Sequence, residues 1–153
     1  AKVWMLRLLG LVYCVAFLGA RWQNGALLGA DGLVPAVRYV DHLKAQNAGG
    51  SALDGFLQHP MIWWWVPPTD ANMELLHLAG ALLGAAVALG LCSGAAMLVL
   101  WLLYFSVVTM AEGSSFYQYG WESQLLETGV IAAFLCGPSR RRPPSFAILL
   151  LMR

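Results

Sequence analysis

The chain has 153 residues, of which 59% are hydrophobic and 11% are charged, and its formal net charge is +1. A water-soluble domain of this size buries only about two-thirds of the surface that its unfolded chain exposes, so it cannot hide this much apolar surface. The composition therefore excludes an ordinary soluble domain and a disordered chain. The near-neutral charge gives no support to nucleic-acid binding. What remains is a polytopic membrane protein.

Apolar runs long enough to form membrane helices set the predicted architecture. A helix needs about 20 mostly apolar residues to cross a bilayer. We expect an all-α fold, a transmembrane helical bundle with four complete spans and the start of a fifth, in which residues 1–153 form the N-terminal membrane region of a longer protein. The predicted spans are residues 3–20, 75–92, 95–111, 121–136 and, incomplete, 146–153.

The distribution of basic residues predicts the orientation of these spans. Three arginines occupy positions 140–142, after the fourth span, and the N-terminus carries Lys2 and Arg7. Lys and Arg gather in the cytosolic loops of membrane proteins, so both of these regions are expected on the cytosolic side. The long loop of residues 21–74 is then lumenal.

This long first loop is expected to hold short interfacial helices rather than a passive linker. The glycines and proline of residues 27–36 predict a turn at the membrane surface, and residues 37–45 can continue as a short amphipathic helix. Three adjacent tryptophans, Trp63, Trp64 and Trp65, precede two prolines. These side chains are expected at the depth of the lipid headgroups, where the indole N–H groups still reach water. The alternative is that they line an aromatic binding groove.

Charged side chains inside the spans are the informative exceptions, because each is costly to place in a bilayer. Glu74 and His77 lie at the start of the second span, where residues 69–72 offer capping oxygens, so we interpret them as parts of a capped helix start. A haem held by two histidines is disfavoured, because His42 and His59 both lie in the loop.

The fourth span carries the dense polar segment GWESQLLETG. Glu122 is expected at the membrane interface, and Glu127 deeper, where it must be hydrogen-bonded, protonated or paired with a cation such as Arg153. A polar clamp between helices and a functional carboxylate are both open readings of Glu127. The candidate structural or partner-binding residues of this segment are Trp121, Glu122, Ser123, Gln124, Glu127 and Thr128.

The same segment carries a family resemblance. Residues 119–129, YGWESQLLETG, resemble the most characteristic segment of the lipase maturation factor family. Residues 28–36, LGADGLVPA, are similar to the family's first lumenal loop with its Gly-x-x-Gly-Leu-x-Pro pattern, and residues 100–108 resemble its third span. Asp31, Gly32 and Pro35 in this loop are therefore added to the partner-binding candidates.

The resemblance implies a multi-pass protein of the endoplasmic reticulum membrane that assists secreted lipases, its clients, to fold and assemble. Such a maturation factor is not an enzyme, and no Gly-x-Ser-x-Gly nucleophile motif occurs in the sequence. No cofactor or metal is expected, because Cys14, Cys92 and Cys136 lie in apolar runs without metal-ligand spacing. The alternatives are a scaffold subunit of a larger membrane complex built on the same helical module and, in a third reading, a membrane enzyme using Glu127.

Overall fold

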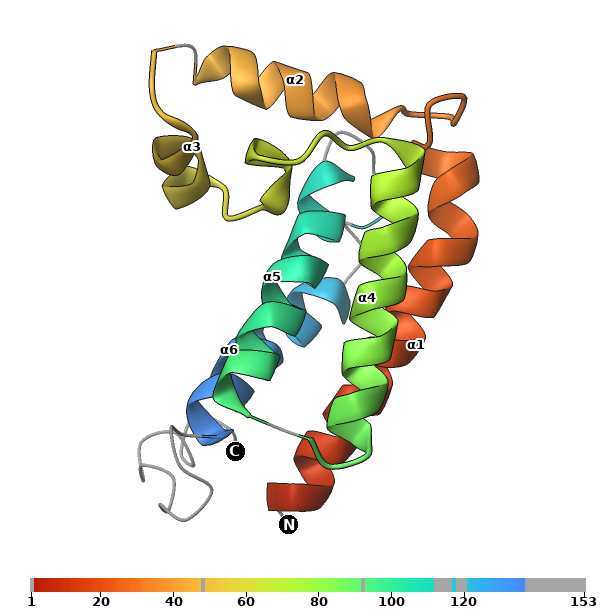
Figure 1. Ribbon diagram of the computed structural model, residues 1–153, viewed down its shortest axis with the longest axis vertical. Coiled ribbons are helices and arrows are strands. Elements are labelled where there is room, and N and C mark those ends of the chain that lie inside the picture. Colours follow the sequence, from red (N-terminus) through yellow and green to blue (C-terminus); the bar gives the residue numbers. More distant parts are fainter. Residues whose placement is uncertain (1, 48, 92, 112–116, 118–120, 137–153) are drawn as a thin grey trace.

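The computed structural model describes residues 2–47, 49–91, 93–111, 117 and 121–136. Throughout these ranges the regular structure is helical, without strands. Long helices form a bundle, and shorter helices cover one end of it (Figure 1). The elements are α1 (Lys2–Leu28), α2 (Ala36–Gln46), α3 (Ala52–Gln58), the short 3₁₀ helix η1 (Ile62–Trp64), α4 (Asp70–Ala88), α5 (Gly94–Met110) and α6 (Trp121–Cys136).

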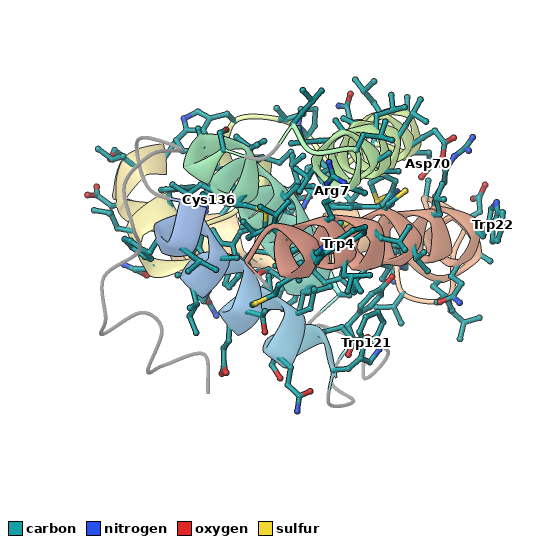
Figure 2. All side chains as sticks on the ribbon, turned by 90° about the horizontal axis from the view of Figure 1, so that it is seen from below. Trp4, Arg7, Trp22, Asp70, Trp121 and Cys136 are labelled. Carbon is teal, nitrogen blue, oxygen red and sulfur yellow. The ribbon has the colours of Figure 1, made fainter. Side chains whose placement is uncertain are left out.

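Two of these helices, α1 and α4, are long and apolar enough to cross a membrane, and α5 is a shorter apolar helix. The Lys2 end of α1 and the Cys136 end of α6 lie at the same end of the bundle (Figure 1). Trp4 and Trp22 of α1 are exposed, and the Arg7 guanidinium carbon lies 5.7 Å from the centre of the Trp4 ring (Figure 2). The all-α prediction is confirmed. The basic run at 140–142 and the apolar run 146–153 lie outside the described residues.

Helix α1 is longer than the span predicted for it. The prediction ended at residue 20, before Arg21, but the helix continues for two more turns to Leu28. In this extension the guanidinium of Arg21 pairs with the Glu74 carboxylate of α4, at 2.6 Å between Nη2 and Oε1. The chain turns only after Leu28, where Val34 donates its N–H to the Leu27 carbonyl at 2.8 Å.

Helix α4 begins earlier and ends earlier than predicted. The Thr69 side chain accepts a hydrogen bond from the Asn72 N–H, so the expected capping segment starts the helix at Asp70. At the other end the chain leaves the helix at Gly90, whose φ of +107° suits glycine and few other residues. The Arg7 guanidinium lies against Gly90, between α1 and α4 (Figure 2).

Glycines let α1 and α4 approach until their backbones touch. A Cβ added to Gly84 would lie 2.8 Å from the Cys14 nitrogen, and one added to Gly10 would lie 2.9 Å from the Gly84 carbonyl oxygen. The small residues of α4 thus allow close packing of this helix against α1. Gly80 similarly makes room for the ring of Phe17.

Aromatic rings fill the centre of the bundle. Tyr13 and Phe17 of α1 are fully buried and both meet the ring of Tyr104 edge-on, with centroids 5.8 Å and 5.4 Å away. The Tyr13 hydroxyl donates a hydrogen bond to the Leu125 carbonyl at 3.0 Å, which ties α1 to α6. The polar ring tip therefore has a partner inside an apolar core.

Residues 29–69 form a cap over one end of the bundle, with α2 lying across it (Figure 1). The amphipathic helix predicted at 37–45 is α2, which buries Ala36, Val40 and Leu43 against the bundle. At the start of the cap, the Ala30 N–H donates to the Asp70 carboxylate at 2.9 Å. The predicted loop thus folds as a layer of its own.

Candidate functional site

The cap end of the bundle encloses a small buried polar group centred on Asn24. The side chains of Asn24 and His77 are only 1% and 2% exposed, and Asn24 Nδ2 lies 3.0 Å from His77 Nε2. The Tyr117 hydroxyl donates to Asn24 Oδ1 at 2.7 Å. Because Oδ1 accepts from Tyr117, Nδ2 is the donor to Nε2, and the proton of His77 is assigned to Nδ1. Asn24 thus joins α1, α4 and the segment before α6.

Tyr117 keeps its proton in this arrangement. The pKa of the Tyr117 hydroxyl is raised to about 12: burial is the largest cause, the hydrogen bond to Asn24 acts in the opposite direction, and the nearby Glu122 adds a smaller increase. The hydroxyl is therefore a donor at neutral pH, as its contact with Asn24 Oδ1 requires.

Glu122 is the buried carboxylate of α6. It is 8% exposed, and its Oε2 has no hydrogen-bond partner among the described residues. Glu127 is exposed on the surface of the described bundle. The two positions differ by about 140° around the helix, so one side chain faces the bundle and the other faces outward. Burial within the bundle is separate from depth in the membrane, and the greater membrane depth expected of Glu127 stays a prediction.

The other residues of the α6 segment divide between an inner and an outer face. Ser123 and Gln124 are exposed and Trp121 is half-exposed, whereas Leu125 packs inward. The Thr128 hydroxyl donates a hydrogen bond to the Gln124 carbonyl, one turn earlier, at 2.7 Å. Among the described residues, no hydrogen bond joins Trp121 or Gln124 to the Asn24 group.

The loop candidates shape the turn into α2 and do not form a common site. A Cβ on Gly32 would lie 2.9 Å from the Leu27 carbonyl oxygen, so only glycine fits there without a shift. Pro35 precedes the first residue of α2, and Asp31 is exposed. Glycine and proline are needed here for geometry.

The three adjacent tryptophans lie in different surroundings and do not line a common groove, while their expected position at headgroup depth stays a prediction. Trp63 is fully buried and donates its Nε1–H to the Ser106 carbonyl of α5 at 2.8 Å. Trp64 is half-buried and donates to the His59 carbonyl at 2.9 Å. Trp65 alone is exposed, at 57%, beside the ring of Phe56. The 3₁₀ turn rotates successive rings into different surroundings.

Sequence reasoning missed Asn24, Tyr117 and Ser106. One signal was present for the first: Arg21 and Asn24 are three residues apart in α1, as Glu74 and His77 are in α4. Residues three apart share a helix face, so two such polar pairs in apolar helices suggest that the faces meet. The sequence pattern offers no equivalent signal for Tyr117, which lies between helices.

The chemistry available at this site is limited. No group of three or more His, Cys, Asp or Glu side chains that could hold a metal occurs within the described ranges. The arrangement holds three parts of the chain together through directed hydrogen bonds, which specify geometry more than they add stability.

Comparison with known proteins decides the family. Residues 1–153 match the family description "Lipase maturation factor transmembrane domain". The chain belongs to the lipase maturation factor family. It is similar to lipase maturation factor 1 of Bos taurus, 37% identical over 138 residues, and of Homo sapiens, 36% identical over 138 residues; each alignment covers 88% of this chain and 24% of the relative. Lipase maturation factor 2 of Xenopus tropicalis is 31% identical over 130 residues, with 81% and 17% covered.

The chain thus spans about a quarter of the length of the curated lipase maturation factor 1 relatives it matches. No solved structure matches it. Membership of the lipase maturation factor family confirms the resemblance carried by residues 119–129, and it establishes the membrane setting of the bundle.

Proposed function

We propose that this chain is the N-terminal membrane domain of a multi-pass protein of the endoplasmic reticulum that helps secreted lipases to fold and assemble. The observation that carries the proposal is the match to the lipase maturation factor transmembrane domain over residues 1–153, together with the similarity to proteins named lipase maturation factors. The role proposed is that of a folding helper and not of an enzyme.

The proposed topology has the cap on the lumenal side. Helices α1, α4, α5 and α6 would each cross the bilayer, although only α1 and α4 have the length and hydropathy that the crossing ordinarily needs. The shared end of the Lys2 and Cys136 termini (Figure 1) supports an even number of crossings between them. The two basic regions would then both face the cytosol.

The cap is the proposed surface for the client. Its folded position is supported by two anchors described above, Ala30 to Asp70 and Trp63 to Ser106. It also presents apolar side chains to the outside, which is the kind of surface that binds an incompletely folded chain. The most exposed of these are Leu33, Leu53, Leu57 and Trp65.

The test uses the full-length protein in cells that lack their own lipase maturation factor. We expect wild type to restore secretion of active lipase, and the double variant Leu53→Ser with Leu57→Ser to lower secreted activity several-fold at unchanged abundance. Gln58→Ser is the matched control, because Gln58 is exposed on the same helix but polar. Failure of wild type to restore secretion, together with co-purification of a fixed set of membrane subunits, would favour the scaffold function instead.

A further inference from the structure

One side of α1 is apolar and exposed along most of the helix. Five large side chains on it are between 52% and 81% exposed; they are Trp4, Leu8, Leu11, Val15 and Trp22. At 3.6 residues per turn, these positions lie within about 60° of one another around the helix. The fully buried Tyr13 and Phe17 lie on the opposite side. Helix α1 is therefore apolar on the side away from the bundle as well as on the side that faces it.

The exposed stripe of Trp4, Leu8, Leu11, Val15 and Trp22 needs an apolar covering. A contiguous patch of large apolar side chains is unusual in contact with water, and a helix that is apolar all round is typical of a membrane span. Helix α1 is long and apolar enough to cross a membrane, and the family match sets this bundle in one. Lipid acyl chains are the covering that this setting supplies.

The two ends of the stripe have the composition of membrane interfaces. Trp4 and Trp22 are its end residues, and tryptophan is enriched at both surfaces of a bilayer. A charged group accompanies each of them. The Arg7 guanidinium carbon lies 5.7 Å from the centre of the Trp4 ring, and Arg21, next to Trp22 in the chain, pairs with Glu74. Between Arg7 and Arg21, α1 carries no charged residue.

The separation of these ends gives the thickness of the apolar layer that the bundle fits. From Trp4 to Trp22 the helix rises about 27 Å at 1.5 Å per residue, and a tilt of α1 would reduce the thickness that it spans. Helix α4 agrees, because it carries no charged residue from Glu74 to its end at Ala88, a rise of about 21 Å. Hydrocarbon layers average about 30 Å, with about 27 Å in the endoplasmic reticulum and about 33 Å in the plasma membrane.

We propose that the stripe on α1 lies directly against lipid acyl chains, and that the bundle fits a thin bilayer with a hydrocarbon layer of about 27 Å. The rings of Trp4 and Trp22 mark the two surfaces of that layer. The Arg21 pair with Glu74 then lies at headgroup depth, below the cap. The proposal rests on the proposed crossing of the bilayer by α1, and it is independent of the lipase function.

The first test identifies what touches the stripe. The photoreactive amino acid benzoylphenylalanine is placed at position 15 of the full-length protein, which is irradiated in vesicles of phosphatidylcholine and analysed by mass spectrometry. We expect an adduct of one phospholipid molecule. The matched control has the same amino acid at position 45, which is exposed on α2 in the cap and should give no lipid adduct. A crosslink from position 15 to a second copy or to another protein, or the absence of a lipid adduct, would overturn the lipid contact.

A second test introduces a charge into the stripe. We expect Val15→Asp to lower the amount of full-length protein in cell membranes several-fold, because an acidic side chain deep in the hydrocarbon layer opposes insertion. Gly25→Asp is the matched control: Gly25 is exposed on the same helix beyond Trp22, a Cβ there meets nothing within 4 Å, and the variant should accumulate as wild type does. Equal abundance of the two variants would mean that the stripe does not face the hydrocarbon layer.

The third test measures the preferred thickness. The temperature of half-maximal unfolding is compared in phosphatidylcholine vesicles whose hydrocarbon layers are about 27 Å and about 33 Å thick. We expect wild type to unfold several degrees higher in the thinner vesicles. Trp22→Leu combined with Ala26→Trp moves the upper tryptophan one turn along the exposed side and should narrow this difference. Equal or greater stability of wild type in the thicker vesicles would overturn the proposed thickness, and an unchanged difference in the double variant would overturn the assignment of Trp22 to the membrane surface. Lipase secretion is a readout of none of these tests, so their failure is distinct from a failure of the proposed lipase function.

Discussion

The hydroxyl of Tyr13 occupies the space that a side chain at position 129 would need. Gly129 is thus required by a residue on a different helix, and the Tyr13 hydrogen bond to the Leu125 carbonyl runs across the gap that the glycine leaves. This relationship accounts for the glycine in the characteristic Leu-Leu-Glu-Thr-Gly run by packing alone.

We expect Gly129→Ala to destabilise the full-length protein by about 1–3 kcal/mol, the usual cost of overpacking a core. Removing the colliding hydroxyl with Tyr13→Phe should recover part of this loss, although Tyr13→Phe alone forfeits a hydrogen bond worth about 1 kcal/mol. Thermal aggregation of the purified variants in detergent measures both effects. Additive losses in the double variant would show that the two residues do not compete for space.

The contact between α1 and α4 gives a second prediction with an internal control. Gly84→Ala forces a Cβ to within 2.8 Å of the Cys14 backbone nitrogen, so we expect the helices to separate and the stability to fall by about 1–3 kcal/mol. Gly84→Leu should do so more severely. Gly19→Ala meets nothing within 4 Å and should be neutral or stabilising by up to about 1 kcal/mol, because alanine favours helix. Equal behaviour of the two alanine variants in thermal unfolding would refute backbone contact at Gly84.

The attachment of the cap to α5 can be tested at Ser106. Its hydroxyl accepts the Ile62 N–H at 3.0 Å and donates to the Leu102 carbonyl at 2.8 Å. Ser106→Ala should leave the Ile62 N–H without an acceptor, at a cost of about 1–3 kcal/mol, and should make the cap more sensitive to limited proteolysis. Thr109→Val is the control, because the buried Thr109 hydroxyl has no partner among the described residues and its removal should not destabilise. Unchanged cleavage of Ser106→Ala in the cap would contradict the anchor.

The fourth prediction concerns the group around Asn24. Asn24→Leu removes the partner of both His77 and Tyr117, so we expect a loss of about 2–4 kcal/mol, beyond that of a single hydrogen bond. Tyr117→Phe removes one bond and should cost about 1 kcal/mol. In the double variant the loss from Tyr117→Phe should disappear, because its acceptor is already absent. Full additivity in thermal unfolding would show that the two side chains act independently.

Local patterns and distant contacts differ in how far they can be predicted from the sequence. The span predicted at 95–111 and the helix Gly94–Met110 differ by one residue at each end, because an apolar run and the Ser93 cap are local signals. The length of α1 was not predicted, because the apolar run ends at Ala20 and the pairing of Arg21 with Glu74, 53 residues away, is not visible in the sequence. Composition alone placed the Trp63–Trp65 run at headgroup depth, whereas the burial of Trp63 within the fold depends on Ser106, on another helix.

The candidate site was the least predictable part for the same reason. The polar segment of α6 was identified correctly as unusual, yet the side of the helix that faces inward depends on Tyr13, 112 residues before Leu125. Asp31, Gly32 and Pro35 were selected by resemblance, and the structure gives Gly32 and Pro35 roles in chain geometry. In a single sequence, a residue needed for backbone geometry cannot be distinguished from a residue needed for binding.

The anchoring of Trp63 has a consequence for the order of events during synthesis. The tryptophan is made before its acceptor, because the Ser106 carbonyl lies 43 residues later in the chain. While a ribosome is still adding those residues, α1 and α4 can already pair through their glycines, but the cap has nowhere to insert its indole ring. The hydrogen-bond acceptor of the Tyr13 hydroxyl, the Leu125 carbonyl, is synthesised later still. The cap can therefore pack against α5 only late in translation. In a chain that stalls before α5 is made, Trp63 would stay exposed and accessible to chaperones and quality control.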